Sequence, residues 1–231
     1  MTKYSNKVYS MPAVPLDDIA VADQLCAMYD QVGPSASMIE LTNTSFAVER
    51  GWLLREPNKE YIDREIEWYE SQSRSIYAMR GKPPAIWKSV SDINGYINSN
   101  YGWCIYSPDN GNQFKHVKRE LQRNPDSRRA VMYYTRPNMH TDQFLNGMND
   151  HMCTYGVQYF IRERHDGPKL DAHVYMRSND AVFGYNNDVA WQKHVHTYLS
   201  QQLDVPKGEL FWNVASLHVY PRHYSLLEPA R

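Results

Sequence analysis

Apolar and polar residues alternate along several stretches of this chain with a period of two, the pattern of a β-strand that buries one face. Together with short apolar runs, this pattern predicts strands at residues 37–49, 128–135, 154–164, 169–178 and 209–220. Other stretches repeat apolar residues at helical spacing. They predict helices at residues 58–73, 113–124 and 187–203, the second of them ended by Pro125, and a short helix near residues 18–29.

Proline, glycine and asparagine mark the connections between these elements. The segments 81–87 and 91–102 are predicted to be loops, and residues 1–35 are predicted to form an irregular arm around the short helix. Helices and strands are mixed without the regular order of a βαβ fold, and the breaks between them are short. The pattern therefore predicts one α+β domain over residues 1–231, built around a single sheet.

Composition narrows the class of protein. The chain has 231 residues, 42% of them hydrophobic, which is enough for one large domain with a core. Lys and Arg number 25 against 26 Asp and Glu, so no basic excess points to nucleic acid. No apolar run approaches the roughly 20 residues of a membrane span, and the N-terminus lacks the pattern of a signal peptide. Three cysteines at irregular spacing favour a reduced, cytoplasmic protein over a disulfide framework.

Two segments carry residues that could do chemistry. Arg128 and Arg129 stand at the start of a predicted strand, where adjacent arginines could grip a phosphate or form a solvated turn. Cys153 stands just before another strand, either as a nucleophile with a lowered pKa or as a small buried hydrophobe. The nine histidines lie in no HExxH or His/Cys zinc pattern, so no metal site is expected. Glycine-rich phosphate loops are also absent from the sequence.

In their order along the chain, these features resemble the thymidylate synthase family. The resemblance runs from about Glu60 to Tyr220 and includes "SRR", a cysteine at a strand start, "RSND" followed by a glycine, and "HVY". Within the family it is closest to the deoxycytidylate (dCMP) hydroxymethylases of phages. The segments that carry this closer similarity are "EYIDREIEWYESQS", "INSNYGW", "NPDSRR", "YTRPNM", "MRSNDAVFG", "AWQK" and "WNVASLHVYPRH".

The resemblance implies a thymidylate synthase-like single domain with a central mixed sheet flanked by helices. It implies that a cysteine thiolate, here Cys153, adds to C6 of a pyrimidine nucleotide, and that C5 then takes a one-carbon unit from 5,10-methylenetetrahydrofolate. It also implies a homodimer with shared sites, in which Arg128 and Arg129 reach the substrate phosphate of the neighbouring subunit. A phage-encoded protein of this kind would work in the host cytoplasm.

Further residues receive roles from the same resemblance. Arg177 and Ser178 match phosphate ligands, the former also close to the reactive sulfur. His218 and Tyr220 match the pair that holds the sugar 3′-hydroxyl. Glu65 matches the carboxylate that organises water and proton transfers at the base, and Tyr101 matches an active-site tyrosine. The residues that match the folate side are Trp87, Asp180 and Gly184.

Asp188 is the position that distinguishes the base. Thymidylate synthases carry asparagine here, whose amide suits N3–H and O4 of uracil. A carboxylate instead accepts from N4–H of cytosine, favours protonation of N3 and offers no donor to O4. Such a mismatch in a buried site is worth several kcal/mol. Taken without the resemblance, Asp188 is better explained as a helix N-cap or first-turn acid, favoured by the helix dipole.

The expected reaction is therefore the conversion of dCMP to 5-hydroxymethyl-dCMP with water as the final nucleophile. The sequence ends eleven residues after Tyr220, whereas family members generally continue into a segment that closes over the folate. We expect closure to be supplied differently or to be looser, which would admit water. Three alternatives stay open: 5-methyl-dCMP formed by hydride transfer, the same chemistry on CMP or dUMP, and a catalytically silent nucleotide-binding homodimer.

Overall fold

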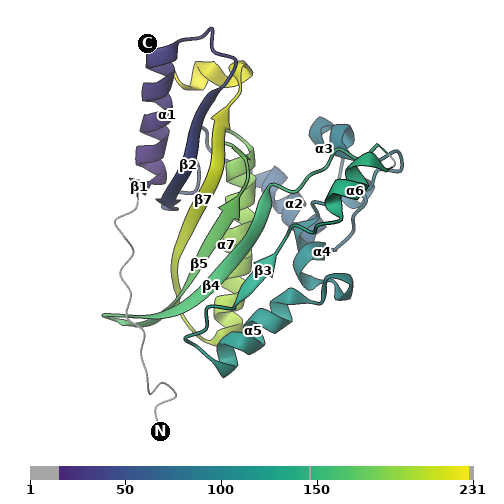
Figure 1. Ribbon diagram of the computed structural model, residues 1–231, viewed down its shortest axis with the longest axis vertical. Helices are drawn as coiled ribbons and strands as arrows, with labels where there is room; N and C mark the ends of the chain where they lie inside the picture. Colours follow the sequence, from purple (N-terminus) through teal and green to yellow (C-terminus); the bar gives the residue numbers. More distant parts are fainter. Residues whose placement is uncertain (1–15, 146, 229–231) are drawn as a thin grey trace.

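A mixed, seven-stranded sheet forms the centre of the fold. The computed structural model describes residues 16–145 and 147–228. The strand order is β1-β2-β7-β5-β4-β3, with β6 paired to β7 (Figure 1). The long strands are β2 (Ile39–Ala47), β4 (Thr154–Arg164), β5 (Gly167–Met176) and β7 (Lys207–Val219). The short strands are β1 (Leu16–Asp17), β3 (Val131–Tyr133) and β6 (Asn179–Asp180).

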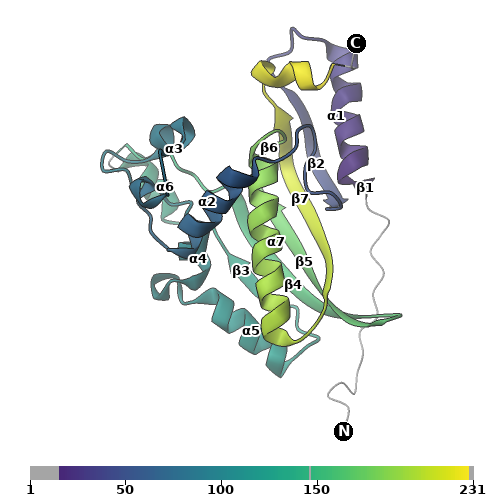
Figure 2. The same cartoon turned by 180° about the vertical axis from the view of Figure 1, so that it is seen from behind.

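Parallel and antiparallel pairs are combined in this sheet. Strand β7 runs antiparallel to β2 but parallel to β5, while β4 is antiparallel to both β5 and β3. A parallel neighbour requires a long crossover, and α7 (Gly184–Leu203) supplies it between β5 and β7. Figure 2 shows α7 lying along one face of the sheet. The α+β fold with a central mixed sheet is thus confirmed.

The remaining helices gather mostly beyond β3 and behind the sheet. They are α1 (Asp18–Val32), α2 (Lys59–Glu70), α3 (Ala85–Val90), α4 (Tyr101–Tyr106), α5 (Gln113–Arg123) and α6 (Met139–Phe144). Short 3₁₀ turns lie at Ile76–Ala78, Pro108–Asn110 and Pro221–Leu226. The predicted strands and long helices are all present, with ends shifted by a few residues.

Three predictions of local structure were wrong in part. The segment 81–87 is not entirely loop, because α3 begins at Ala85 directly after Pro84. The segment 91–102 also ends in a helix, since the Asn100 side chain accepts the Trp103 N–H (2.8 Å) and caps α4. The arm is more regular than predicted, because α1 extends to Val32; its residues 1–15 lie outside the described residues.

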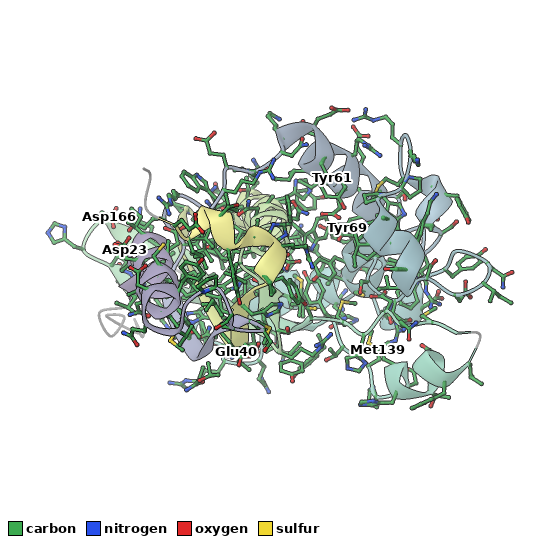
Figure 3. The ribbon with its side chains drawn as sticks, turned by 90° about the horizontal axis from the view of Figure 1, so that it is seen from above. Asp23, Glu40, Tyr61, Tyr69, Met139 and Asp166 are labelled. Atoms are coloured by element: carbon green, nitrogen blue, oxygen red, sulfur yellow. The ribbon has the colours of Figure 1, made fainter. Side chains whose placement is uncertain are left out.

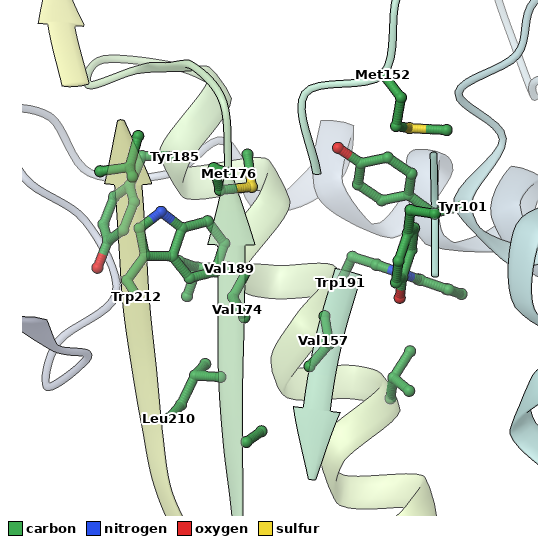
Figure 4. Packing of buried hydrophobic residues seen from close by; sticks show 14 of the residues in the cluster. Tyr101, Met152, Val157, Val174, Met176, Tyr185, Val189, Trp191, Leu210 and Trp212 are labelled. Carbon is green, nitrogen blue, oxygen red and sulfur yellow. The ribbon is translucent and has the colours of Figure 1, made fainter. Parts of the chain in front are cut away.

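The core lies between α7 and the sheet. Trp191 and Val189 of α7 are buried there with Trp212 of β7 (Figure 4). The Tyr185 ring meets the Trp212 ring edge-on at 5.4 Å. Burial of each such side chain stabilises the fold by roughly 1.5–3 kcal/mol. This packing fixes both the rotation of α7 about its axis and its position on the sheet. The polar residues in the first turns of α7 are therefore fixed at one end of the sheet.

The opposite sheet face carries a row of aromatic rings that are buried or half-buried. The rings of Phe160, His173 and Phe211 lie side by side on β4, β5 and β7, at 5.1 Å and 4.7 Å between centroids. Tyr133 and Tyr175 are exposed nearby. Among the described helices, none crosses this face in Figure 1. We refer to Tyr133, Phe160, His173, Tyr175 and Phe211 as the open sheet face.

Helices α2 and α4 approach each other closely at Gly102. A Cβ at this position would lie 1.8 Å from the carbonyl oxygen of Tyr69. The neighbouring Tyr101 ring stacks on the Tyr69 ring at 5.1 Å, and Figure 3 shows Tyr69 and Tyr61 together on α2. Only glycine permits this contact, which places Tyr101 against α2.

Gly102→Ala should therefore destabilise the fold by about 3 kcal/mol, because backbone must move to admit the methyl group. Urea unfolding followed by circular dichroism would measure the loss. Gly111→Ala is the control: its Cβ would meet nothing within 4 Å, and only its positive φ of 76° opposes the change. A smaller loss for Gly102→Ala than for Gly111→Ala would contradict the packing argument.

Candidate active site

Cys153 lies at the start of β4, beside the guanidinium of Arg177. Arg177 Nη2 is 3.6 Å from Cys153 Sγ and also donates to the carbonyl of His151 (2.7 Å). Arg177 Nε donates to the carbonyl of Met152 (3.0 Å), and the Arg177 N–H donates to the carbonyl of Cys153 (2.9 Å). These bonds tie the end of β5 to the segment before β4. The arginine is thereby fixed next to the sulfur.

Opposing effects act on the Cys153 thiol. Burial raises its pKa to about 11, and the Arg177 guanidinium opposes that rise. Asp188 and Asp150 raise the pKa further through their negative charge. The free site therefore holds mainly a neutral thiol near pH 7, and Arg177 stabilises the thiolate when it forms.

Asp188 lies in the second turn of α7 and accepts two side-chain hydrogen bonds. Tyr101 Oη donates to Oδ1 (2.9 Å) and Asn179 Nδ2 donates to Oδ2 (2.7 Å). Behind them, Trp212 Nε1 donates to Asn179 Oδ1 (3.1 Å), and Thr154 Oγ1 lies 3.0 Å from Tyr101 Oη. Asp188 does not cap α7, whose first turn contains no acidic residue. The interpretation of Asp188 as an acid at a helix N-terminus is therefore wrong.

Glu65 is buried in α2, one helical turn from Tyr61. Tyr61 Oη donates to Glu65 Oε1 (2.5 Å) and accepts from Trp87 Nε1 (3.0 Å). The Trp87 ring also packs edge-on against Trp68 at 5.3 Å. This chain of contacts joins α3 to the carboxyl group of Glu65.

The pKa values of the Glu65 and Asp188 carboxyl groups lie above their ordinary range. Burial raises the pKa of Glu65 to about 7, and the charge of Asp188 adds to that rise. Burial also raises the pKa of Asp188 to about 7, against the hydrogen bonds from Tyr101 and Asn179. Both groups can therefore gain and lose a proton near neutral pH, as acid–base groups do.

Other candidate residues lie around the end of β7. His218 is buried on β7, and its ring meets the Tyr220 ring edge-on at 4.9 Å. Asp180 of β6 pairs with His218 in the sheet, and its carboxylate accepts the Val182 N–H (2.9 Å). Ser178 lies between Arg177 and β6, and Gly184 begins α7.

Arg128 and Arg129 lie apart from the Cys153 cluster. They precede β3, whose Val131 pairs with Gln158 of β4, and Gln158 Nε2 donates to the Arg128 carbonyl (2.8 Å). Gln158 is five residues beyond Cys153, or about 16 Å along the strand. Arg129 pairs with Glu120 (3.1 Å), and its side chain is 79% exposed. Among the described residues, no hydrogen bond or ion pair joins either arginine to that cluster.

Several residues that contact the candidate site residues were not predicted from the sequence. Tyr61 touches Glu65, Asn179 holds Asp188, and Glu120 pairs with Arg129. The helical spacing of Tyr61 and Glu65 could have indicated their contact. No local signal predicts the contact between Asn179 and Asp188, since Asn179 is buried by the separate strand that carries Trp212.

Within 16–145 and 147–228, no group of three His, Cys, Asp or Glu side chains could hold a metal ion. In the same ranges, no helix combines the length and apolar character needed to cross a bilayer.

Comparison with known proteins places this geometry in a family. The thymidylate synthase family model matches residues 53–230, and the chain belongs to that family. The deoxycytidylate 5-hydroxymethyltransferase of Enterobacteria phage T4 is 46% identical over 197 residues, covering 82% of this chain and 78% of the phage protein. A thymidylate synthase of Fusobacterium nucleatum is 28% identical, covering 74% and 60%. The fold matches thymidylate synthase A of Bacillus subtilis with a TM-score of 0.65 at 21% identity, covering 87% and 74%.

Alkylation of Cys153 by iodoacetamide should accelerate about tenfold per pH unit between about pH 7 and 10, because only the thiolate reacts. Peptide mass spectrometry separates Cys153 from Cys26 and Cys104. Arg177→Gln should slow the reaction at fixed pH by about tenfold, because the thiolate loses its cationic neighbour.

Arg80→Gln is the matched control, since Arg80 pairs with the exposed Glu67 (2.8 Å). It should leave the Cys153 rate unchanged. Equal rates in wild type and Arg177→Gln would show that Arg177 does not stabilise the thiolate.

Proposed function

We propose that this chain is a deoxycytidylate hydroxymethylase that acts as a single domain within a homodimer. The observation that carries the proposal is Asp188, a carboxyl group held by Tyr101 and Asn179 in the cluster that contains Cys153. Each carboxylate oxygen has two lone pairs, and one on each oxygen is used by the protein. The other two are available to a base that presents a donor. The 46% identity to a phage deoxycytidylate 5-hydroxymethyltransferase supports the same substrate.

Cytosine fits this acceptor better than uracil does. Its N4–H can donate to one Asp188 oxygen, while a proton shared between N3 and the other oxygen completes the pair. That shared proton draws electrons from the ring and makes C6 more electrophilic. A pKa of about 7 for Asp188 allows the proton to be shared near neutral pH.

Cys153 supplies the nucleophile in this proposal. Its Sγ adds to C6, the electron pair moves to C5, and C5 forms a bond to the incoming carbon. Loss of the C5 proton then expels the donor nitrogen from the new carbon and leaves an exocyclic C5=CH₂ group. Water adds to this CH₂ group, the C5–C6 double bond re-forms, and Sγ leaves C6 as the thiolate. Glu65, with a pKa of about 7, is suited to exchange protons and hold water at the base.

The one-carbon donor proposed for this site is 5,10-methylenetetrahydrofolate. When bound, it supplies a carbon at the oxidation level of formaldehyde. Trp87, half-buried and hydrogen-bonded to Tyr61 Oη, offers an indole face to a flat heterocycle. The Asp180 carboxylate, partly exposed on β6, can accept from ring N–H groups, and Gly184 keeps the start of α7 free of a side chain. This set of residues fits a reduced pterin.

Phosphate and sugar contacts complete the substrate site. Arg177 and Ser178 are proposed to bind the phosphate from the same subunit, and His218 with Tyr220 to hold the sugar 3′-hydroxyl. Arg128 and Arg129 are proposed to arrive from the neighbouring subunit. The Arg129–Glu120 pair is exposed and screened by solvent, so a phosphate can replace Glu120. The aromatic residues of the open sheet face are suited to a subunit interface.

The first test incubates dCMP, dUMP and CMP separately with 5,10-methylenetetrahydrofolate. We expect dCMP to gain one CH₂O unit by mass and tetrahydrofolate to be released. Asp188→Asn should shift the dCMP-to-dUMP ratio of kcat/KM toward dUMP by about tenfold to a thousandfold, from rearranged hydrogen bonds worth roughly 1.4–4 kcal/mol. Stoichiometric dihydrofolate would instead indicate methylation. An unchanged ratio in Asp188→Asn would remove the basis for cytosine recognition.

The second test asks whether the sites are shared. Cys153→Ala and Arg129→Ala should each be inactive alone, yet a mixture that exchanges subunits should recover about a quarter of wild-type activity, because half the dimers are hybrids with one intact site.

Cys153→Ala mixed with Arg177→Gln is the matched control. Both residues are proposed to come from one subunit, so this mixture should recover nothing. If native mass spectrometry shows hybrids and the first mixture also stays inactive, the sites are not shared.

A further inference from the structure

The identity of residue 188 is not sufficient to select cytosine. With its pKa near 7, Asp188 carries a proton in a large fraction of molecules at neutral pH. A neutral carboxyl group has one donor and one acceptor oxygen. It could serve cytosine by donating to N3, or uracil by donating to O4. What separates the two bases is therefore which oxygen carries the proton.

Asn179 has a fixed hydrogen-bond direction. The Trp212 indole has only an N–H donor, and it points at Asn179 Oδ1 (3.1 Å). The amide cannot be turned round without facing that donor with its own NH₂. Asn179 must therefore present Nδ2 to Asp188 Oδ2, at 2.7 Å.

Tight packing keeps this amide in place. Asn179 and Trp212 are 3% and 0% exposed. A Cβ at Gly184 would lie 3.3 Å from Asn179 Nδ2, so the first residue of α7 closes the space beside the amide. The donor toward Asp188 is thus permanent.

The contact on the other oxygen can reverse. Tyr101 Oη lies 2.9 Å from Asp188 Oδ1, and a hydroxyl can donate or accept. Thr154 Oγ1 lies within reach of both Tyr101 Oη (3.0 Å) and Met176 Sδ (3.1 Å). When Thr154 donates to Met176, Tyr101 can donate to Thr154 and leave Asp188 Oδ1 free to hold a proton.

We propose that Asn179 selects the base by fixing Oδ2 of Asp188 as an acceptor and confining the carboxyl proton to Oδ1. This inference rests on the proposed function, in which the base pairs with Asp188. Under it, Oδ1 faces N3 of cytosine and Oδ2 faces N4. Uracil would need the proton on Oδ2, and a protonated Oδ2 is a weaker acceptor for the Asn179 N–H than a carbonyl-type Oδ2 is. Asn179 is then a positioning residue that acts through Asp188.

Asn179→Asp tests the proposal with a side chain of the same shape. It retains an acceptor for Trp212 but replaces the donor facing Asp188 with an oxygen, so a proton becomes shared at Oδ2. The dCMP-to-dUMP ratio of kcat/KM should fall by about tenfold to a hundredfold. The pH midpoint that controls dCMP binding should rise by about one unit or more. The ionisable groups that face Asp188 and enter this profile are Glu65, Tyr69, Tyr101, Cys153 and Asp180.

A double variant separates the effect of hydrogen-bond direction from the effect of lost stability. In Asn179→Asp with Asp188→Asn, residue 188 can donate to residue 179, so a hydrogen bond is restored with reversed polarity. The melting temperature should recover while the preference for dCMP does not. If the double variant regains stability and Asn179→Asp alone keeps the wild-type dCMP-to-dUMP ratio, Asn179 has only a structural role and the proposal fails.

Asn186→Asp is the matched control. Asn186 lies on α7 and is also a buried asparagine, but its Nδ2 donates only to the backbone carbonyls of Arg55 and Val182. Any loss it causes should affect dCMP and dUMP equally. A folded Asn179→Asp variant with the same unchanged ratio would overturn the proposal.

Calorimetric binding of dCMP and dUMP keeps the two proposals distinguishable. If the wild type makes no hydroxymethyl-dCMP, the proposed function fails on its own. The ratio of the two dissociation constants in wild type and Asn179→Asp still reports whether the direction of the Asn179 amide controls base choice.

Discussion

The parallel pairing of β5 with β7 is the constraint on which the site depends. It forces the chain to cross the sheet between these strands, and α7 makes that crossing. Because the buried ring of Trp212 packs against Tyr185 of α7, the helix cannot rotate freely. Asp188 is therefore held beside the strand ends that carry Asn179 and the Cys153–Arg177 pair.

The same arrangement explains why the site is electrostatically unusual. Burial that stabilises the fold also raises the pKa of Cys153, Glu65 and Asp188. An ionised carboxylate would be costly in such surroundings, so the groups keep protons that they can exchange near neutral pH. Hydrogen bonds from Tyr101 and Asn179 limit the rise for Asp188. The same buried contacts thus determine both the stability of the fold and the pKa values of the groups that exchange protons.

Sequence patterns predicted much of the framework. The strand-like run "TYGVQYFIRER" matched β4 residue for residue, and the helical spacing of residues 58–73 matched α2 within a few positions. The start of α4 was missed, because a segment rich in Asn and Gly becomes helical there only with the Asn100 cap and the close approach of Gly102 to Tyr69. Local propensity cannot report a contact with a distant backbone carbonyl.

By itself, the sequence determined the period of each long element and the order of Arg128–Arg129, Cys153, Arg177 and Asp188 along the chain. Tertiary structure alone decided what those side chains touch. The Arg177–Cys153 contact spans 24 positions and the Trp212–Asn179 bond spans 33. Hydrogen-bond direction at Asp188 follows from Trp212 being able only to donate, and that fact becomes relevant only once β7 and β6 lie side by side. The period of apolar residues reflects the local geometry of a helix or strand. The direction of the hydrogen bonds at Asp188 instead arises from elements that the fold brings together.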